Sequence, residues 1–385
     1  MSDGGMRYDA THIKVLEGGE AVRKRPGMYV GSTGQRGLHH LVLDVVGRAV
    51  SEVLAGRARS VDVTLTADGG VRVADDGAGD GEAHTPDLER ELTSFYTGPG
   101  PSGRRTAIVT HFGVGLLVAN ALSSRLTAEV RGAGTRWVKE YARGVEADPP
   151  VTVGSETGSG TTLSFWPDAE IFETTWCSFS VVAERFRQLA FLNQGLAISL
   201  TDERPAAGVR RVVFQFPDGV RDFVAALSAE AETGVALEPD VFGFEREDAR
   251  MAGTMEVALL WRGSGKARIR GFANSRATRE GGSHVYGLRD GVVAAVTAFA
   301  RERGLPAASD SDARADRIVE GLTAVVSVKL DHPEFLGSTR ELLGNTEVRV
   351  CVAEAVQERL GEWFAEQPER APELVDRIVG GDEEC

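Results

Sequence analysis

Apolar residues recur at helical spacing between Leu38 and Leu54, where the chain reads LHHLVLDVVGRAVSEVL. The apolar positions 38, 42, 45, 46, 49, 50 and 53 form a broad stripe, which predicts a helix packed against a core. Asp44, Arg48 and Glu52 follow at four-residue steps and project from the opposite side, since each residue turns the helix by about 100°. This polar face either forms a ladder of alternating charge in solvent or lines a pocket.

Alternation of apolar and polar residues predicts the strands of the first half of the chain. Residues 60–66 and 71–75 alternate and are joined by Ala-Asp-Gly-Gly, which indicates a hairpin. The glycine-punctuated segment 107–123 runs into a second apolar helix. Further strands are expected at 127–131, 135–142, 161–167, 196–202 and 210–216, and a helix at 179–193. This order of elements predicts an α/β sandwich with mixed or antiparallel pairing, not a Rossmann fold.

The second half has a strand–helix–strand order. Strands are expected at 257–261, 267–275 and 322–330, with helices at 285–303 and 347–367. Pro217-Asp218-Gly219 marks a boundary between the two halves, because such residues interrupt regular structure. The segment Pro306 to Ala315 is polar and is expected to be a loop or partly disordered.

Composition narrows the classes of function. A chain of 385 residues suggests two domains. Its 57 acidic and 43 basic residues give a net charge of −14, so autonomous nucleic-acid binding is not expected. Cys177, Cys351 and Cys385 are scattered without CxxC spacing, which argues against a disulfide framework or a zinc site and favours a reducing cytoplasm. No apolar run reaches the roughly 20 residues that cross a bilayer, so a cytoplasmic protein without a membrane partner is expected.

Three short motifs could carry chemistry, and each also has a plain structural explanation. Residues 75–81 combine carboxylates with glycines that allow a ligand to approach the backbone. Gly113-Val114-Gly115 precedes an apolar helix, as in loops that bind phosphate at a helix N-terminus. Arg23-Lys24-Arg25 is either a phosphate patch or a solvated run of charge.

Longer segments resemble the ATPase region of the bacterial DNA gyrase B family, within the GHKL ATPase superfamily. They are YDATHIKVLEGGEAVRKRPGMYVGST (8–33), GLHHLVLDVV (37–46), VADDGAG (73–79), GTTLSFWP (160–167) and EGLTAVVSVKLDHPEF (320–335). The resemblance implies an α+β protein, with a GHKL-type α/β sandwich for nucleotide binding at 1–217. A transducer domain at 218–385 follows, with a β-α-β crossover and a fold like that of a small ribosomal protein. The topoisomerase region of the family is not expected in this sequence.

The resemblance also implies a binding site and partners. Asp75 stands where the family's carboxylate accepts the adenine amino group, Gly79 where the base approaches, and Thr161 where a hydroxyl supports that carboxylate. Gly113, Val114 and Gly115 would lie against the phosphates of ATP. The implied assembly is a homodimer, in which an N-terminal arm containing Tyr8 and Ile13 reaches the partner, and gyrase subunits are further candidate partners.

The catalytic positions depart from the family pattern. Asp44 replaces the glutamate that acts as general base, and a carboxylate displaced by about 1 Å can lose roughly a hundredfold in rate. Arg48 replaces the asparagine that holds magnesium, and a guanidinium has no lone pair to give to a cation. Arg48 is also placed to pair with Asp44 at i,i+4. Bound magnesium is therefore not expected.

The phosphate-binding segments depart as well. The family's Gly-Gly-Lys lid reads Thr97-Gly98-Pro99, and bulky residues at 109–112 replace a glycine-rich run. The family's sensing loop, Gln-Thr-Lys, reads Ser338-Thr339-Arg340, and Arg340 could still contact a phosphate through its forked guanidinium.

Three functions are open at this point. The first is an active ATP-hydrolysing gyrase B fragment. The second is a protein that binds adenine nucleotides or other small molecules with weak or no ATP hydrolysis, in self-resistance to gyrase-directed antibiotics or in docking on gyrase; retained adenine-site residues without magnesium chemistry favour it. The third is a pocket recruited as a biosynthetic enzyme in secondary metabolism. Its polar groups would be Asp44, Arg48, His111 and His40.

Overall fold

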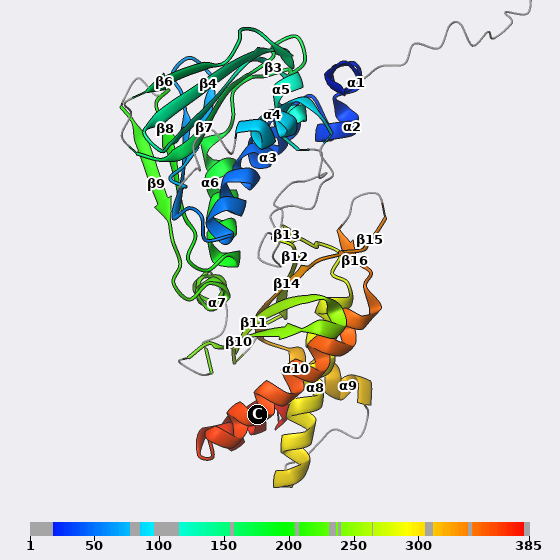
Figure 1. Ribbon diagram of the computed structural model, residues 1–385. Coiled ribbons are helices and arrows are strands. Elements are labelled where there is room, and N and C mark those ends of the chain that lie inside the picture. Colours follow the sequence, from blue (N-terminus) through cyan, green and yellow to red (C-terminus); the bar gives the residue numbers. More distant parts are fainter. Residues whose placement is uncertain are drawn as a thin grey trace, which may run out of the picture.

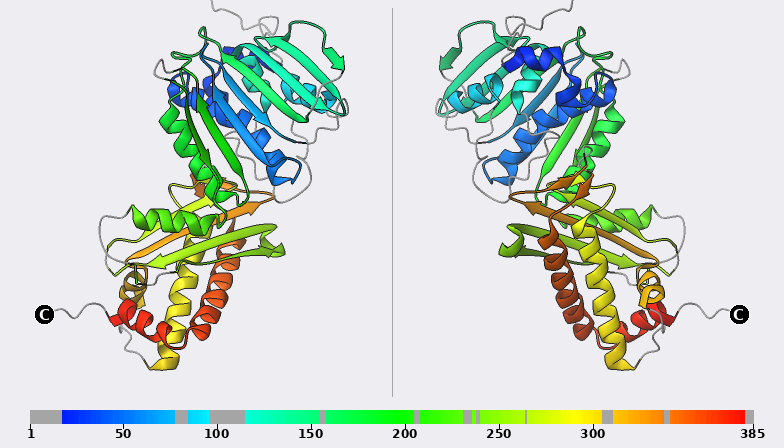
Figure 2. Two further views of the ribbon diagram at one scale, coloured as in Figure 1. Left: turned by 90° about the vertical axis from the view of Figure 1, so that its left-hand side faces the viewer. Right: turned by 90° about the vertical axis from the view of Figure 1, so that its right-hand side faces the viewer.

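The chain folds around two β-sheets that lie one above the other, as Figure 1 and Figure 2 show. The computed structural model describes residues 18–77, 85–95, 115–154, 158–204, 208–230, 236–237, 240–263, 265–304, 311–337 and 341–380. The first sheet has nine strands and the second has five. Helices pack against both sheets, so the α+β class expected from the sequence is confirmed.

The first sheet runs in the order β5-β4-β3-β7-β2-β1-β8-β9, with β6 paired to β4. β1 and β2 pair antiparallel with Val61 opposite Asp75, which confirms the hairpin, while β1 and β8 are parallel. The strands are β1 (Ser60–Leu65), β2 (Val71–Asp75), β3 (Ser123–Gly132), β4 (Thr135–Ala142), β5 (Val145–Glu146), β6 (Val151–Gly154), β7 (Gly160–Pro167), β8 (Ala197–Asp202) and β9 (Arg210–Phe214). The mixed pairing expected for a sandwich is therefore present.

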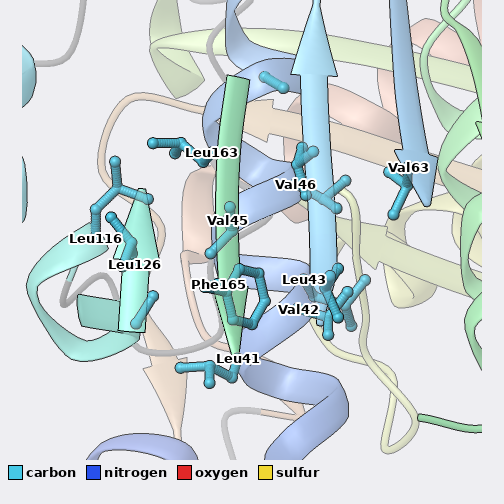
Figure 3. Packing of buried hydrophobic residues seen from close by; sticks show 14 of the residues in the cluster. Leu41, Val42, Leu43, Val45, Val46, Val63, Leu116, Leu126, Leu163 and Phe165 are labelled. Atoms are coloured by element: carbon cyan, nitrogen blue, oxygen red, sulfur yellow. The ribbon is translucent and has the colours of Figure 1, made fainter. Parts of the chain in front are cut away.

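The helix predicted around Leu38 to Leu54 is the central helix of this half. It spans Gln35–Leu54 as α3 and lies across the first sheet, where Val45 and Val46 are fully buried. Figure 3 shows these side chains among Leu163 and Phe165 of β7. Burying one such aliphatic side chain contributes about 1.5–3 kcal/mol, so this stripe anchors the helix. The other helices of this half are α1 (Gly18–Lys24), α2 (Gly27–Val30), α4 (Thr85–Thr93), α5 (Leu116–Ala121) and α6 (Phe179–Leu192).

The basic run near the start of the described chain has a structural role at its first residue. Arg23 of α1 donates through Nη1 to the carbonyl oxygen of Ala121, at 2.9 Å. Its Nη2 lies 2.8 Å from Oδ2 of Asp168, which is buried. Arg23 therefore ties α1 to the end of α5 and to the chain after β7, whereas Lys24 and Arg25 are exposed.

The second sheet has the order β10-β11-β14-β12-β13. β12 and β14 are parallel, and α8 lies between them in the chain, so the predicted β-α-β crossover is confirmed. The elements are α7 (Val220–Ala229), β10 (Phe242–Asp248), a 3-10 turn (Ala249–Met251), β11 (Gly253–Trp261), β12 (Arg268–Ala273), β13 (Arg276–Ala277), α8 (Ser283–Arg303), α9 (Ser311–Val319), β14 (Leu322–Leu330), β15 (Phe335–Leu336), β16 (Leu342–Leu343), α10 (Thr346–Glu366) and α11 (Arg370–Gly380).

One segment of the second half differs from the sequence prediction. Residues 306–315 were expected to form a loop or to be partly disordered, but α9 begins at Ser311, so the last part of this segment is helical. Ile318 and Val319 at the end of α9 are buried in the second core, which supplies the packing that the polar sequence before them lacks. Residues 306–310 lie outside the described part of the chain.

A third group of buried residues connects the two halves. Phe191 of α6 stacks on Phe216 and on Phe223 of α7, with ring centroids 3.7 Å and 4.7 Å apart. Phe223 in turn lies 5.7 Å from Phe272 of β12. This aromatic row joins the last helix of the first half to the second sheet.

Two further observations concern membrane-spanning helices and cysteines in the described part of the chain. None of these helices is long and apolar enough to cross a membrane. Cys177 and Cys351 are buried free thiols, and Cys385 lies outside the described residues.

Candidate functional site

The polar face of α3 is covered by the protein. Asp44 is 3% exposed, and the side chains of Arg48 and Glu52 are 16% and 15% exposed. The solvated ladder is therefore wrong, because the protein covers this face of α3. Glu52 accepts two hydrogen bonds from Arg57, at 2.7 Å and 3.0 Å.

Arg48 reaches across to the first sheet. Its Nη1 donates to Oδ2 of Asp75 at 2.9 Å, and its Nη2 donates to Oγ1 of Thr161 at 3.4 Å. Its Nε lies 3.9 Å from Oε2 of Glu91 on α4. The predicted pairing of Arg48 with Asp44 is wrong for the described residues, because the guanidinium spans from α3 to β2 and β7 instead of following its own helix.

Asp75 is held from both sides. It sits opposite Thr161 in the antiparallel pairing of β2 and β7. Its Oδ1 accepts from the backbone N–H of Gly77 at 3.2 Å and of Thr161 at 3.3 Å, while Oδ2 faces Arg48. Burial raises the pKa of Asp75, and the charge of Arg48 together with the two backbone donors opposes that rise. Arg48 and the two backbone donors thus stabilise the charged form of this buried carboxylate.

A glycine allows the strands to meet at this point. Gly160 has φ of +139°, a region that other residues rarely adopt. A Cβ there would lie 2.2 Å from the carbonyl oxygen of Asp75. The close approach of β7 to β2, which places Thr161 beside Asp75, therefore requires glycine at 160.

Glu91 is a member of the site that sequence reasoning missed. It projects from α4, and burial raises its pKa while Arg48 opposes the rise. The available signal was Thr85-Pro86-Asp87, a helix-start pattern, followed by Leu88 and Leu92 at four-residue spacing. Read as a helix, that segment would have placed Glu91 on the face next to the buried leucines.

Other candidates fall elsewhere. Gly115 directly precedes α5, and among the residues of the Gly113-Val114-Gly115 turn it alone is described. His40 has its Nδ1 2.9 Å from the carbonyl oxygen of Val30, and burial lowers its pKa. Predicted residues outside the described part of the chain are Gly79, Thr97, Gly98, Pro99, Val109, Thr110, His111, Phe112, Gly113, Val114, Ser338, Thr339 and Arg340.

Two sequence families match the chain, one over each half. Residues 33–171 match the family of histidine kinase-, DNA gyrase B- and HSP90-like ATPases, and residues 219–384 match the DNA gyrase B family. The ATPase domain of Thermus thermophilus gyrase B, solved with an aminocoumarin, is 32% identical, with a TM-score of 0.80 over 94% of each chain. The chain belongs to the DNA gyrase B family.

Longer members of the gyrase B family extend beyond the matched region. The DNA gyrase B protein of Streptomyces coelicolor is 41% identical over 98% of this chain, and the novobiocin-resistant gyrase B protein of Streptomyces niveus is also 41% identical over 98%. The novobiocin-sensitive gyrase B protein of Streptomyces niveus is 39% identical over 97%. This chain spans about 58% of the length of each of these relatives.

The residues of this site do not fit the magnesium of a gyrase B ATPase. Arg48 occupies the position implied for the metal-holding asparagine, and a guanidinium cannot ligate a cation. In the described part of the chain, no group of three or more His, Cys, Asp or Glu side chains is placed to hold a metal ion. Asp75 and Thr161, which the family resemblance assigns to the adenine end, lie together, but both accept hydrogen bonds from Arg48.

Proposed function

We propose that this member of the gyrase B family is a binding protein for adenine nucleotides or related small molecules, with weak or no ATP hydrolysis. The observation that carries the proposal is the 2.9 Å ion pair between Arg48 and Asp75. It occupies the carboxylate that the family resemblance assigns to the adenine amino group. It also puts a fixed positive charge where a metal ligand would be needed.

The pair sets a condition for any ligand in this cleft. An amino or amide head must either share Asp75 with Arg48 or displace it, and displacement leaves a buried guanidinium in need of another partner. An anionic group on the ligand would supply that partner without a metal ion. Binding in this cleft is therefore expected to be independent of magnesium.

The first test restores the residues of the family pattern. Arg48→Asn combined with Asp44→Glu is expected to raise ATP hydrolysis by on the order of tenfold or more over wild type, because it returns a metal ligand and a longer general base. Hydrolysis would be measured as phosphate release with and without magnesium. Arg57→Asn is the matched control, because it removes an arginine that pairs with Glu52 and leaves Asp75 untouched.

Two results would contradict the proposal. One is a wild-type rate equal to that of the double variant. The other is a loss of wild-type hydrolysis on removal of magnesium, which would show an ordinary ATPase.

The second test asks which ligand stabilises the wild-type protein. ATP, ADP, a non-hydrolysable ATP analogue and an aminocoumarin would each be added with and without magnesium while the melting temperature is followed. Equal shifts with and without magnesium support the proposal. Stabilisation by the aminocoumarin but not by nucleotides would favour a role in antibiotic self-resistance, whose support is the aminocoumarin complex of the Thermus relative. Stabilisation only by other uncharged apolar compounds would favour a pocket recruited for biosynthesis.

We further propose a homodimer formed through the N-terminal arm that contains Tyr8 and Ile13. The support is the family resemblance of residues 8–33, and the arm itself lies outside the described residues. Light scattering on the full chain should give a dimer mass that falls to the monomer when residues 2–17 are deleted. A monomer mass for the full chain at high concentration would contradict the proposal.

A further inference from the structure

A cavity lies between the two halves of the protein. It has a volume of about 960 Å³ and is lined by α3 and α6 from the first half and by β12, β13 and the chain before β16 from the second. Five arginines line it, which is the feature that separates it from the Arg48 site. They are Arg36 of α3, Arg185 of α6, Arg270 of β12, Arg276 of β13 and Arg279 just beyond β13.

The carboxylates around this cavity do not balance the arginines. Glu184 and Glu341 are the acidic residues of the described lining. Oε1 of Glu341 lies 3.8 Å from Nε of Arg279. Oε2 of Glu184 lies 3.7 Å from Nη1 of Arg187, which is not part of the lining. The described cavity wall therefore carries an excess of positive charge.

Several of these arginines lack a carboxylate partner. Among the described residues, Arg36 and Arg270 have no hydrogen-bond or ion-pair partner, and Arg185 donates to the amide oxygen of Gln188. Burial, together with the charges of Arg276 and Arg279, lowers the pKa of Arg185 to about 10. Arg36, Arg270 and Arg279 are exposed, so water solvates their charges in the unliganded protein, whereas Arg185 and Arg276 are partly buried.

The neighbouring histidines add no negative charge. His39 accepts from the backbone N–H of Ser178 at 3.0 Å, and burial lowers its pKa. His40 also lines the cavity, and its pKa is lowered by burial and by Arg36, Arg185 and Arg276. The cavity is therefore neutral or cationic at every described lining position except the two glutamates.

We infer that this cavity binds a small anion that carries two or more phosphate groups. Guanidinium groups bind phosphate oxygens through paired N–H donors, and each phosphate can face more than one arginine. A cavity of about 960 Å³ is at the upper end of the usual range for small ligands, which suits a triphosphate alone or on a nucleoside. Because the arginines come from both halves, the bound anion would hold α3 and α6 against β12 and β13.

The test uses inorganic triphosphate as the probe, with ATP and adenosine for comparison. Titration calorimetry at fixed ionic strength should show binding of triphosphate and ATP and none of adenosine at this site. Arg36→Gln with Arg270→Gln should weaken triphosphate binding by about tenfold or more, since each lost charged hydrogen bond is worth that order of affinity. Arg211→Gln, a change on β9 that is outside the lining and pairs with Asp62, should leave it unchanged.

A stability measurement separates binding from folding. Neither Arg36 nor Arg270 has an internal partner in the described structure, so the double variant should melt at or above the wild-type temperature while losing the stabilisation by triphosphate. A double variant that still binds triphosphate with wild-type affinity would overturn the inference. So would a duplex DNA that binds more tightly than triphosphate with the same dependence on both arginines, because the surface would then be a nucleic-acid groove.

The triphosphate-binding test of this cavity does not depend on the proposed function of the Arg48 site. Asp75→Asn should leave triphosphate binding unchanged, since Asp75 is not part of this lining. Loss of triphosphate binding in Asp75→Asn with retention in Arg36→Gln and Arg270→Gln would place the anion in the Arg48 cleft and overturn the inference.

Discussion

At the scale of single residues, Arg48 determines the charge and hydrogen bonding of the site around Asp75. Its guanidinium crosses from α3 to the buried carboxylate of Asp75 and also contacts Thr161 and Glu91. The sequence predicted that Asp75 and Thr161 would lie together, because the resemblance placed them there. It did not predict their contact with Arg48, because i,i+4 spacing reports only on neighbours within one helix and says nothing of a strand 27 residues away.

The energy of this ion pair can be measured by a double-variant cycle. Arg48→Met should lower the free energy of unfolding by about 3–5 kcal/mol, because it leaves Asp75 charged and buried without its partner. Arg48→Met with Asp75→Asn should recover most of that loss, since a neutral amide can keep the backbone hydrogen bonds. Urea unfolding of the wild type, both single variants and the double variant gives the coupling energy. If the losses in the two single variants simply add in the double variant, the coupling energy is zero and the ion pair does not stabilise the fold.

One buried histidine should make the stability of the second half fall in acid. His284 of α8 is fully buried, its Nε2 lies 3.0 Å from Oγ1 of Thr278, and burial lowers its pKa to about 3. In the unfolded chain this histidine has a pKa of about 6.5, so below that pH the unfolded chain binds a proton that the folded chain does not bind. The contribution of neutral His284 to stability is therefore fully present above about pH 6.5 and is lost as the pH falls. At pH 5.5 the loss from this residue should be about 1.4 kcal/mol.

The measurement is urea unfolding at pH 7.5 and pH 5.5. His284→Gln keeps a polar group near Thr278 but has no titrating ring, so its stability should fall less over this interval. An equal fall in wild type and variant would contradict the assignment.

At the scale of elements, two glycines set the distance between α8 and α10, which Figure 2 shows side by side beneath the second sheet. A Cβ at Gly287 would lie 2.4 Å from the carbonyl oxygen of Arg349, and a Cβ at Gly291 would lie 2.5 Å from that of Ala353. These are backbone contacts that cannot move without parting the helices. The absence of a side chain at both positions therefore permits the close packing.

Replacement of one of these glycines should destabilise the protein although alanine favours a helix. Gly291→Ala should cost about 1–3 kcal/mol through the clash, which outweighs the roughly 1 kcal/mol that alanine contributes to helix propensity. Gly361→Ala in α10 is the matched control, because a Cβ placed there would have nothing within 4 Å, and it should be neutral or stabilising. Thermal unfolding of both variants is the measurement, and a change of the same sign in both would contradict the packing argument.

The elements also show what the sequence could and could not reveal. Strand β2 was predicted with its observed bounds and α3 to within a few residues, because one face of each is buried and the apolar period is clear. Helices α4 and α9 were missed because each is short and polar, with few apolar residues to mark a period. Glu91 was missed with α4. The arginine cavity was not predicted either, because Arg36, Arg185 and Arg270 are far apart in sequence and meet only in the folded chain.

At the scale of the whole molecule, the row of aromatic rings between the two sheets governs how the halves unfold. Phe223 is its central member, with Phe191 on one side and Phe272 on the other, and it is 8% exposed. Each sheet has a separate apolar core, so Phe223 contributes chiefly to the junction between them. Coupling between the halves should therefore depend on this residue more than on residues inside either core.

Phe223→Ala should separate the unfolding of the two halves. Removal of a buried phenylalanine costs about 3–5 kcal/mol, and here the loss falls on the junction, so calorimetry should resolve two transitions where the wild type shows one. Phe364→Ala is the control, because Phe364 is fully buried inside the second core. It should lower the temperature of a single transition without splitting it. A single transition in both variants would mean that the halves are held together by contacts other than this aromatic row, with the arginine cavity as the next interface to examine.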